Sequence, residues 1–124
     1  MKSHSLLQSF QFAWQGIRYA LKHDKNFTIH LAATVLVIGL TIYFDVSPFE
    51  IGLLGVMILL VIIAEMLNTA IEKMVDLITK EYREEAKIAK DVSAGMVLMA
   101  SLGALVVGVI IFTPYLLNAL GIVH

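Results

Sequence analysis

Three long apolar segments dominate this sequence and restrict the folds that are open to the chain. They cover about residues 27–44, 51–79 and 88–120. Each is long enough to cross the hydrocarbon core of a bilayer, which takes roughly 20 helical residues at about 1.5 Å of rise per residue. The 59% share of hydrophobic residues also exceeds that of a typical water-soluble domain. We therefore expect an all-α integral membrane protein with three transmembrane helices.

The rest of the composition excludes several kinds of chemistry. The chain has no cysteine, so disulfides, thiolate metal sites and cysteine nucleophiles are excluded, and oxygen or imidazole must hold any metal. A net charge of −1 argues against a nucleic-acid partner. The first apolar segment follows a long polar stretch, which is not typical of a cleaved signal peptide. We expect residues 1–124 to form one membrane domain.

The basic residues predict how the spans are oriented. They precede the first span or lie in the 73–90 segment, where the second span ends and the third begins, and the short turn at residues 45–50 has none. Because lysine and arginine are enriched in cytoplasmic loops, the N-terminus and the 73–90 segment are expected to be on the cytoplasmic side of a cell membrane. The nine basic residues are Lys2, Arg18, Lys22, Lys25, Lys73, Lys80, Arg83, Lys87 and Lys90.

The segment before the first span is amphipathic. At 100° per residue, Leu6, Phe10 and Trp14 share one side of a helix over about residues 5–22, whereas Arg18 and Lys22 lie elsewhere. This pattern predicts a surface helix on the cytoplasmic leaflet, with Trp14 at headgroup depth. The alternative is a soluble amphipathic helix packed on the remainder of the chain, which offers no soluble body for such packing.

Polar side chains interrupt the second span at helical spacing. Glu65, Asn68, Glu72 and Asp76 fall within an arc of about 80° on a helical wheel, and they are called the acidic stripe below. Glu65 lies deepest. A carboxyl group at that depth costs a few kcal/mol on insertion scales, so it must be protonated, paired or set in a water-accessible cavity.

The acidic stripe alone is compatible with three functions. Its members could be buried ion-pair partners of Lys73 or of Lys90 from the next helix. They could form a proton or cation path, as in a non-enzymatic membrane protein, or they could form a metal site. Spacing does not separate the path from the metal site, because both use carboxylates. His30, in the first span, is expected to be an interhelical hydrogen-bond partner and not a ligand.

A second charged cluster favours phosphate chemistry. Residues 81–85 form a charged link, and Lys90 and Asp91 open the third span near the cytoplasmic end of the acidic stripe. Carboxylates beside a lysine suit a polyphosphate held through Mg²⁺, which usually takes one or two protein carboxylates together with phosphates and water.

These residues together resemble a known family. Glu65-Met-Leu-Asn-Thr-Ala-Ile-Glu-x-x-Val-Asp76, followed by Lys90-Asp-Val-Ser-Ala-Gly, is similar to the signature of the small prokaryotic membrane lipid kinases, the diacylglycerol kinase and undecaprenol kinase family. Trp14-x-Gly-x-Arg18 and Asn26-Phe27 support the resemblance, which covers nearly the whole chain. The sequence of residues 67–79, together with Ile-Phe-Thr-Pro near the end of the chain, is more similar to the undecaprenol kinases of Gram-positive bacteria than to proteobacterial diacylglycerol kinases.

The resemblance implies a role for each residue of the two clusters. Glu65 would be the catalytic base on the lipid hydroxyl, and Glu72 and Asp24 would hold Mg²⁺, although the family usually has glutamate where this chain has Asp24. The lipid would also contact Trp14 and Arg18. ATP would be bound by Phe12, Asp24, Asn68, Glu72, Asp76, Glu81, Tyr82, Arg83, Lys90 and Asp91.

The resemblance also implies an assembly and a reaction. The family works as a homotrimer with active sites shared between subunits. The expected reaction is ATP- and Mg²⁺-dependent phosphorylation of undecaprenol at the cytoplasmic membrane surface. Phosphorylation of diacylglycerol to phosphatidic acid is the first alternative, and a non-enzymatic ion path or accessory protein is the second.

Overall fold

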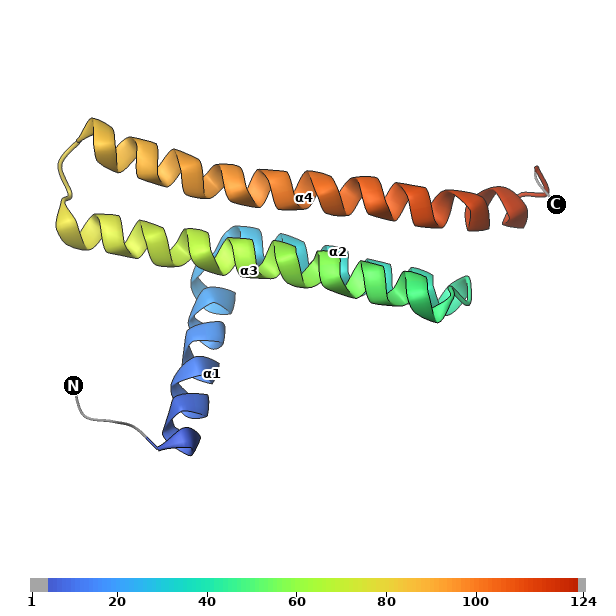
Figure 1. Cartoon of the computed structure of the whole chain (residues 1–124), viewed down its shortest axis with the longest axis horizontal. Coiled ribbons are helices and arrows are strands. Elements are labelled where there is room, and N and C mark those ends of the chain that lie inside the picture. Colours follow the sequence, from blue (N-terminus) through green and yellow to red (C-terminus); the bar gives the residue numbers. More distant parts are fainter. Residues whose placement is uncertain (1–4, 123–124) are drawn as a thin grey trace.

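A computed structural model of the chain describes residues 5–122, so Lys2 lies outside the described part. Its four helices are α1 (Leu6–His23), α2 (Lys25–Tyr43), α3 (Pro48–Ile78) and α4 (Glu84–Ala119). α3 and α4 form a long antiparallel pair, α2 packs against α3, and α1 projects steeply from this bundle (Figure 1). Because α2, α3 and α4 are each long and apolar enough to cross a membrane, the expected all-α fold with three candidate spans is confirmed.

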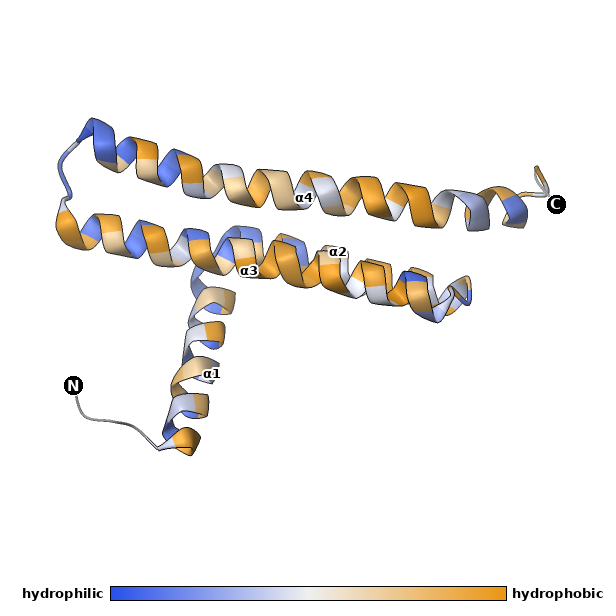
Figure 2. Ribbon diagram, viewed as in Figure 1, coloured by the Kyte–Doolittle hydropathy of each residue, from blue (hydrophilic) through white to orange (hydrophobic). Residues whose placement is uncertain are grey.

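The hydropathy of the helices follows this arrangement. Apolar residues cover most of α2, α3 and α4, whereas polar residues gather at the α3–α4 link and in the first turns of α4 (Figure 2). α1 is mixed along its length, as expected of an amphipathic helix. Most large apolar side chains are exposed in the isolated chain, so the bundle offers its apolar surface to a lipid environment.

Polar side chains cap the helices at their N-termini. Ser5 forms a capping box with Gln8 at the start of α1, and Ser47 caps α3 just before Pro48. Asp24 ends α1 and caps α2 through a 2.9 Å hydrogen bond from the Asn26 amide. The chain therefore turns from the surface helix into the first span at Asp24, which fixes this carboxylate at the level where the bundle begins.

The last helix differs most from the expected bounds. It begins at Glu84 and not near residue 88, because Glu84 and Glu85 are favourable in a first turn, where the helix dipole attracts negative charge. The helix also continues through Pro114 to Ala119. Gly103 lies where α3 and α4 approach closely, since a β-carbon there would stand 3.3 Å from Met57 Cε.

α2 and α4 both pack beside α3, and an apolar groove of about 640 Å³ runs between them. Its lining includes Leu40 of α2, Val61 of α3, and Ala104 and Gly108 of α4. The hydroxyl of Ser101 on α4 is buried at this groove and has no hydrogen-bond partner within the described residues.

A polar clamp holds the turn at the opposite end of the bundle from the α3–α4 link. The Tyr115 hydroxyl donates to Glu50 Oε1 at 2.6 Å, and the Ser47 hydroxyl donates to the same oxygen at 2.6 Å. The Ser47 amide in turn donates to the Tyr115 hydroxyl at 3.3 Å. Asp45, in the turn itself, has a φ of 51°, a left-handed conformation that aspartate adopts more readily than most residues.

Removing the Tyr115 hydroxyl should loosen this turn without affecting the chemistry at the other end. We expect Tyr115→Phe to lower the midpoint of thermal unfolding in detergent, because Glu50 and the Ser47 amide each lose a partner. Tyr43→Phe is the matched control, since Tyr43 is 79% exposed. Equal midpoints for the two variants would show that the clamp contributes nothing to stability.

Candidate active site

The deepest acid of the acidic stripe is enclosed by protein. Glu65 is only 1% exposed, and its Oε2 lies 3.3 Å from His30 Nε2 on α2. Neither carboxylate oxygen has a hydrogen-bond partner within the described residues. His30 therefore approaches Glu65 across the α2–α3 interface without the hydrogen bond that was expected, and Glu65 keeps hydrogen-bonding capacity that no described residue uses.

Asp24 stands directly beside Glu65. Its Oδ2 accepts a 3.0 Å hydrogen bond from the Thr69 hydroxyl, which joins the α1–α2 junction to α3. Burial raises the pKa of Asp24, but contacts with Glu65, Thr69 and the amides of Asn26 and Phe27 outweigh burial and lower it below its ordinary value. Asp24 is therefore held as a carboxylate, which can accept a hydrogen bond from Glu65 whenever Glu65 is protonated.

Asn68 connects the acidic stripe to α4. Its side-chain Oδ1 accepts a 2.6 Å hydrogen bond from the hydroxyl of Ser93, which is completely buried. Its Nδ2 donates to Glu72 Oε1 at 3.4 Å. Glu72 itself is exposed, so the stripe passes from a buried acid at Glu65 to an open carboxylate within two helical turns.

The lysines near the stripe make different contacts from one another. Lys90 Nζ donates to Asp76 Oδ1 at 2.8 Å, which links α4 to the exposed end of the stripe. Lys73 Nζ lies 5.6 Å from the centre of the Tyr19 ring on α1. Among the described residues the lysine ion pairs involve Asp76 and Asp91, so the ion-pair interpretation holds for Asp76 and does not extend to Glu65 or Glu72.

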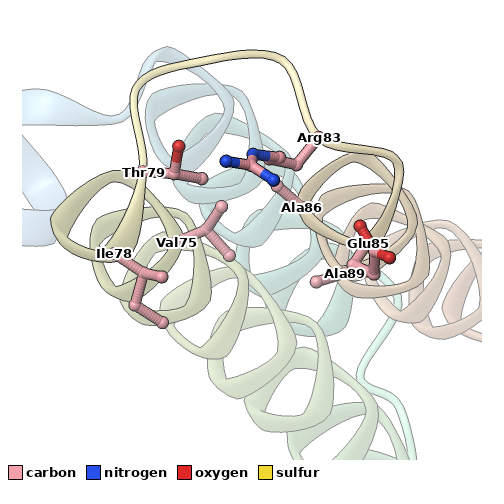
Figure 3. Close-up of a pocket in the computed structure, with 7 residues that line it drawn as sticks. All are labelled: Val75, Ile78, Thr79, Arg83, Glu85, Ala86 and Ala89. Carbon is pink, nitrogen blue, oxygen red and sulfur yellow. The ribbon is translucent and has the colours of Figure 1, made fainter.

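The α3–α4 link forms the rim of the site. Arg83 and Glu81 approach within 4.0 Å of each other, and Tyr82 is largely exposed. Arg83 also lies over a shallow pocket of about 460 Å³ between the end of α3 and the start of α4 (Figure 3). Thr79 stands opposite Arg83 in this pocket, and the carboxylate of Glu85 lies below Arg83 on the α4 side (Figure 3).

Other candidate residues lie further from the stripe. Phe12, Trp14 and Arg18 are exposed on α1, which projects from the bundle (Figure 1). Asp91 pairs with Lys87 one turn earlier on α4. The structure therefore brings together Asp24, Glu65, Asn68 and Glu72, with Asp76 and Lys90 beside them, while contacts of the remaining candidates with substrate stay predictions.

The acids fit a shared magnesium ion better than a closed metal centre. Among residues 5–122 no three His, Asp or Glu side chains form a group that could hold a metal alone. Mg²⁺ usually keeps several waters and takes one or two protein carboxylates plus substrate phosphates. Glu72 and Asp24, next to the unpartnered oxygens of Glu65, provide donors of this kind.

Two hydroxyl residues of this site were not among the sequence-based candidates. The Thr69 hydroxyl donates a hydrogen bond to Asp24, and the Ser93 hydroxyl donates one to Asn68. The position of Ser93 carried a usable signal, because a residue three positions after Lys90 shares its face of the helix. Thr69, four residues after Glu65, likewise borders the acidic stripe on α3, but its partner Asp24 is 45 residues away in the chain and could not be identified from spacing.

Comparison with known proteins places this site in context. Residues 11–112 match the family model described as prokaryotic diacylglycerol kinase. A diacylglycerol kinase of Synechocystis sp. is 42% identical over 115 residues, which are 92% of this chain and 66% of that protein. The undecaprenol kinase of Bacillus subtilis is 36% identical over 109 residues, covering 88% of this chain and 89% of that protein.

A third relative extends the comparison. The diacylglycerol kinase of Escherichia coli is 33% identical over 101 residues, covering 82% of this chain and 83% of that protein. The Synechocystis protein is thus more similar to this chain than the Bacillus undecaprenol kinase is. The expectation that the sequence lies nearest to the undecaprenol kinases is not supported.

Proposed function

The chain belongs to the prokaryotic diacylglycerol kinase family of membrane lipid kinases, and from this premise we propose that it transfers the γ-phosphoryl group of ATP to the hydroxyl of a membrane lipid. The observation that carries the proposal is the buried carboxyl group of Glu65, which lies in a helix long enough to span a membrane and whose two oxygens have no hydrogen-bond partner among residues 5–122. A buried acid of this kind is costly and is usually retained for function.

Glu65 is the general base in this proposal. A lipid hydroxyl that arrives from the bilayer would donate to one of the two unpartnered oxygens of Glu65. His30, 3.3 Å from Oε2, limits how the carboxylate can rotate. Asp24, whose low pKa keeps it charged, stands beside Glu65, and its negative charge favours uptake of the hydroxyl proton by Glu65.

The exposed end of the stripe would bind the phosphates. Glu72 and Asp24 would hold Mg²⁺, which neutralises charge on the phosphate oxygens when bound. Lys90 would exchange its 2.8 Å contact with Asp76 for a phosphate oxygen, acting as a point charge. No covalent enzyme intermediate is needed, because phosphoryl transfer depends mainly on positioning and charge neutralisation.

The remaining candidate residues surround the general base Glu65 and the phosphate-binding end of the acidic stripe. Around the nucleotide we assign Asn68, Asp76 and Asp91 to the phosphate side, and Phe12, Glu81, Tyr82 and Arg83 to the rim. Trp14 and Arg18 on α1 would contact the lipid where it meets the membrane surface. The basic residues at residues 18–25 and 73–90 favour a cytoplasmic position for this end of the bundle.

A homotrimer would complete the site. A single chain leaves Glu72 and Asp76 exposed and an apolar groove open between α2 and α4. Small residues at Ala104 and Gly108 allow another helix to approach that groove closely. Neighbouring subunits could therefore cover both the phosphate end of the site and the apolar groove.

Diacylglycerol is the preferred substrate in this proposal, and undecaprenol is the alternative. The relative with the higher identity is a diacylglycerol kinase, whereas an undecaprenol kinase is only slightly less similar. A competition assay separates them: purified protein receives both lipids at equal concentration with labelled ATP and Mg²⁺. The proposal predicts mostly labelled phosphatidic acid, and mostly undecaprenyl phosphate would assign the other substrate while keeping the reaction.

A further inference from the structure

The hydroxyl of Ser93 is the most completely buried polar group near the stripe. Its residue is 0% exposed, on the face of α4 that packs against α3. The hydroxyl lies 2.6 Å from Asn68 Oδ1 and 2.9 Å from the carbonyl oxygen of Lys90. A hydroxyl has one proton, so at any moment Ser93 donates mainly to one of these two acceptors.

The carboxylate of Glu72 determines which acceptor the Ser93 hydroxyl uses. A carboxylate can only accept, so Glu72 Oε1 must face the amide nitrogen of Asn68. The carbonyl oxygen of the Asn68 side chain is then turned toward α4, where the Ser93 hydroxyl is its donor at 2.6 Å. With the amide reversed, the Asn68 oxygen would face the Glu72 oxygen, and two acceptors would oppose each other.

We propose that Ser93 is a positioning residue that holds the Asn68 amide in the orientation that Glu72 requires and, through this amide, holds the Glu72 carboxylate in position for Mg²⁺ and ATP. This inference rests on the proposed function, because it gives Glu72 its role in the kinase site. The path runs from Ser93 on α4 to Asn68 and Glu72 on α3, so it joins the two helices that pack together most extensively. The path includes only the Oε1 atom of Glu72, and the other carboxylate oxygen of Glu72 is not part of it.

Steady-state kinetics of Ser93→Ala test the positioning role. We expect the KM for Mg–ATP to rise about two- to tenfold, the range that loss of one buried hydrogen bond produces, while the KM for the lipid stays unchanged. Ser101→Ala is the matched control, because Ser101 is a serine of the same helix whose buried hydroxyl has no partner among the described residues. A Ser93→Ala enzyme with an unchanged KM for Mg–ATP, or with both KM values raised alike, would overturn the assignment.

A double-mutant cycle tests whether Ser93 acts through Asn68. Adding Ser93→Ala to an Asn68→Ala protein should cause no further rise in KM, since the amide to be oriented is already absent. Independent, additive effects would refute the path. Ser93→Cys serves where Ser93→Ala folds poorly, because it keeps the side-chain size with a weaker donor and should give an intermediate KM.

A binding measurement separates this inference from the proposed reaction. Affinity for a non-hydrolysable Mg–ATP analogue should fall by the same two- to tenfold factor in Ser93→Ala, without any need for turnover. Unchanged affinity would overturn the Ser93 role even in an active kinase. Weakened affinity in a protein that phosphorylates no lipid would instead keep the Ser93 role and refute the proposed function.

Discussion

Glu65→Gln should lower the rate of lipid phosphorylation by about 10²–10⁴-fold, the usual contribution of a general base. The amide cannot take the proton of the lipid hydroxyl, although it has almost the same shape as the carboxyl group. The fold should survive, because within the described part of the chain neither oxygen of Glu65 has a hydrogen-bond partner that the substitution would remove. Initial rates at saturating lipid and Mg–ATP measure the effect.

Glu50→Gln is the matched control for this prediction. It changes another glutamate of α3, at the opposite end of the helix in the polar clamp. It should leave the rate unchanged at temperatures where the protein is folded. A Glu65→Gln protein that phosphorylates lipid at a rate near that of the wild type would remove Glu65 from the chemistry.

Glu72→Gln should lower kcat/KM for Mg–ATP by about 10²–10³-fold, because a lost metal ligand weakens charge stabilisation worth several kcal/mol. Added Mg²⁺ should restore part of the rate, since the defect is in binding the ion. Glu65→Gln should not respond to added Mg²⁺, because its defect is in proton transfer. A magnesium titration of the two variants therefore distinguishes a ligand from a base.

Glu84→Gln is the corresponding control. Glu84 is an exposed glutamate in the first turn of α4 and has no proposed contact with metal or nucleotide. If Glu84→Gln and Glu72→Gln shift the magnesium dependence equally, the effect comes from general surface charge and the assignment of Glu72 as a ligand is refuted.

Much of the architecture could be predicted because it depends on local sequence. The apolar length of each span and the helical period of the acidic stripe are properties of consecutive residues. The apolar pattern predicts that α4 starts near residue 88. The observed start at Glu84 reflects a different local effect, the preference for acidic residues in a first helical turn.

The contacts within the site could not be predicted in the same way. Whether Ser93 meets Asn68 depends on the rotation of α4 about its own axis, which is set by packing against α3. The hydrogen bond between Thr69 and Asp24 depends on where α1 turns into α2. These contacts decide which polar groups are held and which, like Glu65, keep unused hydrogen-bonding capacity.

The central claim is that the acidic stripe of α3 is a phosphoryl-transfer site. The most direct test adds γ-labelled ATP and Mg²⁺ to purified wild-type protein in detergent, with diacylglycerol or undecaprenol in separate reactions. We predict that label appears in the organic-phase lipid of at least one reaction and disappears when Mg²⁺ is chelated. Folded protein that labels neither lipid would contradict the claim and would favour an ion path built on the same acids.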